Sequence, residues 1–173
     1  APFGGNPLIL VKHTDLPASR KNERRGFLTF DVSQFSAAQL KEAQLVLDPE
    51  PSGLGFSALV PDSRFAVYGI TDDAQDSWDE STLRWEESPA CTDDGIVLEK
   101  TRKLAEFSIP RGGVTGSITV GGEALAEFVR KDANGLVTFI IVRETGETDP
   151  SGLVHAFASK EHPTANPPTL RLK

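Results

Sequence analysis

The feature that most constrains this chain is the alternation of apolar runs, four to eight residues long, with polar or Gly/Pro-rich breaks. Runs of this length are typical of β-strands, because helices of globular proteins are usually longer. Fifteen glycines and twelve prolines favour tight turns between them. The pattern predicts strands at residues 8–12, 26–32, 43–47, 65–70, 82–85, 104–109, 117–120, 136–142, 154–158 and 169–172. So many short strands predict an all-β fold, an antiparallel jelly-roll-like β-sandwich.

Two of these runs indicate how the strands are buried. In residues 26–32, Leu28, Phe30 and Val32 share one face, which we expect in the core. Residues 136–142 are almost continuously apolar, as expected for a central strand covered on both faces.

One short helix is predicted at residues 123–131. There Leu125, Phe128 and Val129 recur at i, i+3 and i+4, and Asn134-Gly135 is available to end the helix. We expect it to lie across one end of a sheet.

Length and composition set further bounds. With 173 residues and 38% apolar content, residues 1–173 are expected to form a single β-sandwich domain, with a truncated N-terminal edge. The net charge of −7 argues against nucleic acid as a partner, and no apolar run is long enough to span a membrane. The single Cys91 excludes an internal disulfide. A start at Ala1 and the lack of methionine predict a mature or excised part of a larger protein.

Both tryptophans lie in one motif. Residues 78–90 read W-x-E-x-T-L-x-W-x-x-x-P-A, and the chain also carries F-L-x-F-D at 27–31, V-Y-G-I-T-D at 67–72 and S-K-E at 159–161. Together these elements resemble the DNRLRE-type β-sandwich modules of secreted polysaccharide-degrading proteins. The resemblance covers residues 8–172.

The resemblance implies an extracellular, noncatalytic carbohydrate-binding module within a larger multidomain secreted protein. Its partner would be a polysaccharide, with no nucleic acid and no membrane involved. Because Trp78 and Trp85 belong to the shared motif, we expect them to pack inside, with Glu80 and Thr82 as partners for their polar groups.

Cationic residues gather in one stretch of this acidic chain. The stretch between residues 12 and 25 contains Lys12, His13, Arg20, Lys21, Arg24 and Arg25. If Lys12 ends one strand and Arg25 begins the next, they meet at a sheet edge, where Lys160 can join them. Arginine matches a carboxylate or sulfate with two parallel hydrogen bonds, which favours a uronate or sulfated glycan such as alginate or ulvan. The predicted ligand-binding residues are therefore Lys12, His13, Lys21, Arg24, Arg25 and Lys160.

A plainer interpretation of the same residues is a solvated loop whose positive charges balance acidic residues elsewhere in the chain.

Two long polar segments, 15–23 and 144–151, are the expected positions of recognition loops.

No cofactor is expected to be required, but a structural calcium ion is a possibility. The acidic run Asp72, Asp73, Asp76, Asp79 and Glu80 supplies the hard oxygen ligands that calcium prefers. Its spacing differs from that of an EF-hand, and an ordinary solvated loop is the alternative.

Two other functional classes stay open. A polysaccharide lyase or glycoside hydrolase needs an organised acid and base, and His155 is the candidate base for a lyase. A structural or adhesion module would have no glycan affinity of its own.

Overall fold

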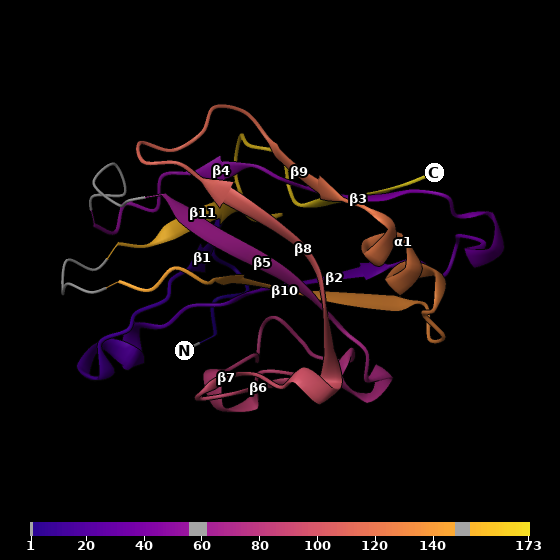
Figure 1. The fold of residues 1–173 in the computed structure, drawn as a ribbon, viewed down its shortest axis with the longest axis horizontal. Helices are drawn as coiled ribbons and strands as arrows, with labels where there is room; N and C mark the ends of the chain where they lie inside the picture. The colour runs from indigo at the N-terminus through magenta and orange to yellow at the C-terminus, as the bar shows by residue number, and fades with distance from the viewer. Residues whose placement is uncertain (1, 56–61, 148–152) are drawn as a thin grey trace.

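The computed structural model describes residues 2–55, 62–147 and 153–173. The chain forms an all-β sandwich of antiparallel strands with one short α-helix (Figure 1). One layer is a four-stranded sheet in the order β2-β10-β5-β8. Its strands are β2 (Gly26–Asp31), β10 (Leu136–Arg143), β5 (Ser63–Ile70) and β8 (Thr101–Ile109).

Two three-stranded sheets form the opposite layer. One has the order β1-β11-β4, from β1 (Leu8–Val11), β11 (His155–Ala158) and β4 (Pro49–Glu50). The other has the order β12-β3-β9, from β12 (Thr169–Leu172), β3 (Ala43–Leu47) and β9 (Ile118–Gly121). A two-stranded ribbon pairs β6 (Cys91–Thr92) with β7 (Gly95–Ile96). Short 3₁₀ helices occupy Pro17–Asn22, Ala37–Gln39, Asp73–Gln75, Trp85–Glu87 and Leu98–Lys100.

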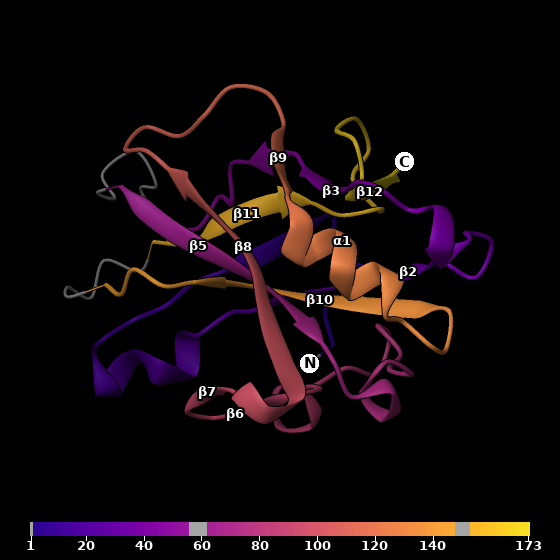
Figure 2. The same cartoon turned by 45° about the vertical axis from the view of Figure 1, so that its right-hand side comes forward.

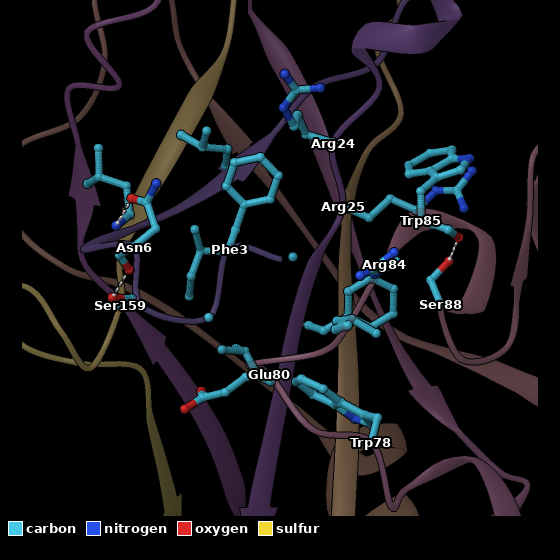
Figure 3. A pocket seen from close by; sticks show the side chains of 18 of the residues that line it. Phe3, Asn6, Arg24, Arg25, Trp78, Glu80, Arg84, Trp85, Ser88 and Ser159 are labelled. Atoms are coloured by element: carbon cyan, nitrogen blue, oxygen red, sulfur yellow. Dashed lines mark hydrogen bonds between the residues drawn. The ribbon is translucent and has the colours of Figure 1, made fainter. Parts of the chain in front are cut away.

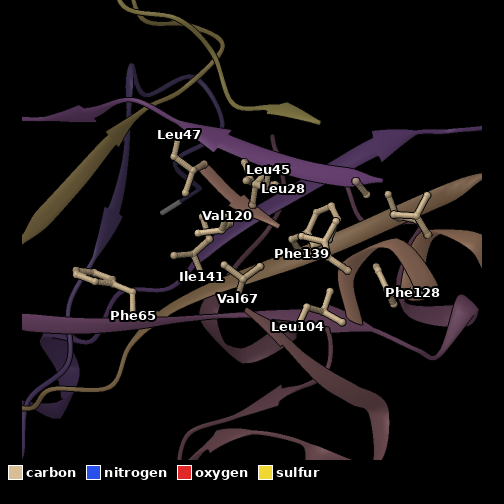
Figure 4. Packing of buried hydrophobic residues seen from close by; sticks show 14 of the residues in the cluster. Leu28, Leu45, Leu47, Phe65, Val67, Leu104, Val120, Phe128, Phe139 and Ile141 are labelled. Carbon is tan, nitrogen blue, oxygen red and sulfur yellow. The ribbon is translucent and has the colours of Figure 1, made fainter. Parts of the chain in front are cut away.

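The core lies between the two layers. Leu45 and Leu47 of β3 belong to the same buried cluster as Val67 of β5 and Phe139 and Ile141 of β10 (Figure 4). The expected core face of β2 is confirmed, because Leu28 and Val32 are buried and Phe30 packs against this cluster.

Strand β10 is central, as predicted. It pairs with β2 on one side and β5 on the other. Phe139 and Ile141 face the sandwich core, whereas Ile140 belongs to a second cluster on the opposite face of the sheet. The segment between β5 and β8 supplies residues to that second cluster, including Ala90 and Ile96. Both faces of β10 are therefore covered.

The predicted helix is α1 (Glu123–Arg130), which lies against β3, β8 and β9 (Figure 2). Leu125, Phe128 and Val129 are buried, as the spacing predicted. The expected role of Asn134-Gly135 in ending the helix is wrong, because α1 ends four residues earlier. Gly135, at φ 83°, instead makes the turn into β10.

Residues 82–85 do not form the predicted strand. The Asp79 side chain accepts hydrogen bonds from the backbone and hydroxyl of Ser81, and the Asp79 carbonyl accepts from the backbone N–H of Thr82 and Leu83. Such local bonds satisfy the backbone within a turn and compete with strand pairing. The chain then enters the 3₁₀ helix that begins at Trp85.

Among the described residues, no helix has the length and apolar character needed to cross a membrane.

The aromatic packing around Phe139 gives the first prediction. Its ring is fully buried and contacts Phe30 and Phe128, with centroid distances of 5.9 and 5.6 Å. Phe139→Ala should lower the free energy of unfolding by about 3–5 kcal/mol through lost burial and a residual cavity. Urea unfolding measures this loss. Phe35→Ala, at a ring that is 55% exposed, is the control and should change it by less than about 0.5 kcal/mol. Equal losses would contradict the assigned core.

Candidate functional site

A groove of about 1200 Å³ is the candidate site (Figure 3). It is lined by the N-terminal segment, parts of β1 and β2, the loop before β2, and residues from the tryptophan motif. Gly4 fits closely against this motif, since a Cβ added there would come within 2.4 Å of the Glu80 carbonyl oxygen. Two segments far apart in sequence are thus held together to form the groove.

Cationic side chains are the most frequent charged groups in the groove. They are Arg20, Lys21, Arg24, Arg25, Arg84 and Lys160, and the acidic residues are Glu23, Asp79, Glu80 and Glu86. The groove therefore carries a net positive charge in a chain whose formal charge is −7. Four predicted ligand residues, Lys21, Arg24, Arg25 and Lys160, lie together here.

The groove cations differ in how they are held. The Lys160 Nζ lies 2.6 Å from the Glu80 carboxylate, and the Arg20 Nη1 lies 3.2 Å from the Asp94 carboxylate. Within the ranges that the structure describes, Lys21, Arg24, Arg25 and Arg84 form no ion pair. These four can therefore bind an anion without first breaking a salt bridge.

Arg25 is positioned by contacts other than ion pairs. Its guanidinium carbon lies 4.2 Å from the centroid of the Trp85 ring, and its Nη1 donates a hydrogen bond to the Thr92 carbonyl. The Arg24 Nη1 donates to the Glu23 carbonyl, whereas its buried Nε has no partner among the described residues.

Both tryptophans line this groove and are half-buried, so they do not simply pack inside. The Trp78 indole donates to the Thr138 hydroxyl and the Trp85 indole to the Asp93 carboxylate. The expected partners Glu80 and Thr82 are wrong. Glu80 pairs with Lys160, and the Thr82 hydroxyl donates to the Asp79 carbonyl. Sequence reasoning missed the Trp78 contact because Thr138 lies in β10, 60 positions along the chain. Asp93 lies only eight positions after Trp85, but the spacing alone did not indicate that the two side chains meet.

Two predicted ligand residues lie away from the groove. The backbones of Lys12 and Arg24 pair at the sheet edge as expected, but the Lys12 side chain is only 4% exposed. Its Nζ lies 3.2 Å from the Glu147 carboxylate, so Lys12 points inward and is a correction to the predicted set. The His13 ring bonds Glu23 at 2.9 Å, and this bond raises the pKa of His13.

The loop expectations have mixed outcomes. Residues 15–23 contain a 3₁₀ helix and place Arg20 and Lys21 in the groove. In the segment 144–151, residues 148–151 lie outside the described residues.

A buried charged cluster explains the position of Lys12. Arg143 donates to the carbonyls of His13, Thr145 and Leu153, and to the Glu147 carboxylate. Glu147 thus forms ion pairs with both Arg143 and Lys12 in the interior. Buried charges that lack such partners are strongly unfavourable.

His155, the candidate lyase base, belongs to this interior as well. It is 9% exposed, lies against the Phe65 ring, and does not line the groove. Burial and the nearby Arg143 lower the pKa of His155 to about 4.

The acidic run does not converge as a whole. Asp72 accepts a hydrogen bond from the Ala74 N–H and pairs with Lys100, while Asp79 and Glu80 make the contacts described above. Asp73 and Asp76 lie close to Asp132, a residue that sequence spacing had not singled out.

No family model and no curated protein matches this chain. Among solved structures, it is similar to a recombinantly expressed latent aurone synthase (polyphenol oxidase), with a TM-score of 0.38, 13% identity and coverage of 96% of this chain and 24% of the other. For latent aurone synthase (polyphenol oxidase) from a natural source, the TM-score is 0.37 and the identity 12%, with coverage of 99% of this chain and 25% of the other. This chain thus spans about a quarter of those proteins, and likeness at this level carries no argument about activity.

The lowered pKa of His155 predicts a pH dependence of stability. In the folded protein the pKa is about 4, below the ordinary value of 6.5, so the unfolded chain binds the proton more tightly. The contribution of His155 is complete above pH 6.5 and is lost as the pH falls toward 4. His155→Gln should remove about 2–3 kcal/mol of this acid-induced loss, measured by urea unfolding between pH 7 and 4.

His13→Gln is the matched control for this prediction. The pKa of His13 is raised, so His13 stabilises the protein at acid pH, and the stability it contributes is lost as the pH rises through its folded pKa. Its replacement should steepen the loss of stability on acidification. Equal slopes for the wild type and His155→Gln would contradict the interior assignment of His155.

Proposed function

We propose that this protein is a noncatalytic carbohydrate-binding module that holds an anionic polysaccharide in the groove. The observation that supports this most strongly is the grouping of six cationic side chains with the rings of Trp78 and Trp85 along one groove. The motif resemblance to DNRLRE-type modules of secreted polysaccharide-degrading proteins points the same way.

The arrangement suits repeating carboxylates or sulfates on a sugar polymer. A guanidinium that forms no ion pair can form two parallel hydrogen bonds with such a group. Arg25 is held against Trp85, so less side-chain freedom is lost when it binds. Aromatic rings add contact area for the apolar faces of sugars.

The biological use would be proximity. A module tethered to a catalytic domain raises the local concentration of that enzyme at the polymer, so weak monovalent binding suffices. Secretion and a multidomain context belong to this same proposal.

The groove arginines provide the direct test. Arg24→Ala with Arg25→Ala should abolish retention on an alginate or ulvan affinity gel, because two unpaired guanidinium groups leave the groove. The matched control is Lys41→Ala with Arg171→Ala, which removes the same charge from exposed positions outside the groove. Retention should also fall as salt increases. Unchanged retention of the arginine variant would end the proposal, and an equal loss in both variants would mean that net charge alone controls retention.

Trp85 gives a second test of the same groove. Trp85→Ala removes the surface on which Arg25 lies and should weaken affinity by about two- to fivefold, as expected for an exposed cation–π contact. Trp85→Phe keeps a ring at this position and should lie closer to the wild type. Titration calorimetry with alginate oligosaccharides measures the affinity of both variants. An unchanged affinity of Trp85→Ala would show that Trp85 does not contribute to binding.

The enzyme alternative has its own readout. A polysaccharide lyase would produce an unsaturated sugar that absorbs in the ultraviolet when the protein is incubated with alginate, ulvan or chondroitin. Product formation would favour the lyase, whereas absence of both product and retention would favour a structural or adhesion module.

A further inference from the structure

Three carboxylates meet beside the outer face of the four-stranded sheet. One oxygen from each of Asp73, Asp76 and Asp132 lies within 4.8 Å of the others. Asp73 and Asp76 come from the turn after β5, and Asp132 from the turn between α1 and β10. Like charges at this spacing repel one another, so the cluster needs a positive partner or protons.

The residues around the cluster supply no such partner. In residues 2–55, 62–147 and 153–173, none of these three carboxylates forms a salt bridge. The neighbouring Asp72, by contrast, pairs with Lys100. The Gly135 backbone N–H donates to the Asp132 Oδ2 at 2.7 Å, whereas the Asn134 amide makes contacts of only 3.4 Å with the Asp73 carbonyl and the Asp76 Oδ2. Contacts of the latter length are weak hydrogen bonds.

Asp76 gives a separate indication of a ligand. Asp76 is only 3% exposed, and its buried Oδ1 has no hydrogen-bond partner in the described part of the chain. A carboxylate oxygen withdrawn from water without a donor is costly. Burial raises the pKa of Asp76, and burial also raises that of Asp132.

The geometry points to a calcium site formed by Asp73, Asp76 and Asp132. Calcium binds oxygens at about 2.3–2.6 Å, so one ion can contact oxygens up to about 5 Å apart. Magnesium binds at about 2.0–2.1 Å and demands near-ideal octahedral geometry, which makes it the poorer fit. Three carboxylates plus water would complete the six to eight ligands that calcium takes.

This site goes beyond the proposed glycan binding and stands apart from it. It is nevertheless connected to the groove wall through Thr138. Burial raises the pKa of Asp76 and a hydrogen bond from Thr138 opposes that rise, while the same hydroxyl accepts from the Trp78 indole. Occupancy is therefore expected to change tryptophan fluorescence as well as stability.

The test uses the full chain after treatment with EDTA and dialysis. Calcium at one hundred times its Kd should raise the Tm by about 5–10 °C, and EDTA should reverse the rise. Asp132→Asn, at a partly exposed turn, should weaken the affinity for calcium at least tenfold, measured by titration calorimetry. Asp72→Asn is the matched control, because it removes an acid from the same run outside the cluster, and its affinity should be unchanged.

Asp76→Asn separates the calcium site from a cluster held together by protons. If calcium occupies the site, this variant loses the calcium-dependent rise in Tm. If protons alone hold the cluster, calcium leaves the Tm of the wild type unchanged, and the proposal is overturned. Calcium binding that Asp132→Asn retains in full would also overturn it. Glycan retention is measured separately, so failure of the calcium site leaves the groove proposal untouched.

Discussion

The burial of β10 on both of its faces is the constraint on which the rest of the structure depends. Phe139 and Ile141 fill the space between the two layers, and Thr138 and Ile140 would otherwise meet water on the outside. The long segment between β5 and β8 covers that outer face. In doing so it places Trp78 and Trp85 beside β2 and forms one wall of the groove. The same segment thus buries one face of a strand and forms a wall of the groove.

Charge placement follows from the same architecture. In the interior, Glu147 forms ion pairs with both Lys12 and Arg143. The groove holds Lys21, Arg24, Arg25 and Arg84, which form no ion pair with any of the described residues, and also the paired Arg20 and Lys160. Burying a charge without a partner is far more unfavourable than leaving it at a surface. Lys12 and Arg143 can therefore be buried because Glu147 pairs with them, whereas a cation without a buried acidic partner stays at the surface. An acidic chain can therefore present a positive groove.

Prediction from sequence succeeded where the pattern is local. Leu28 and Phe30 were assigned to the core face from alternation alone, and Leu125, Phe128 and Val129 from helical spacing. It failed at residues 82–85, where the hydrogen bonds of Asp79 outcompeted an alternating pattern. The same limit applies to the site. Clustering in sequence correctly grouped Arg24 with Arg25, but it could not reveal that Glu147, more than 130 positions along the chain, draws Lys12 inward.

The sequence by itself determined the β-sandwich class, the central strand, the short helix and the stretch that supplies most groove cations, because periodicity and local composition encode these features. Only the tertiary structure decided which cations share a surface, that the tryptophans line a groove, and that Asp132 joins Asp73 and Asp76. These depend on contacts between segments distant in the chain. Such contacts are set by the packing of one layer on the other, and no local pattern records them.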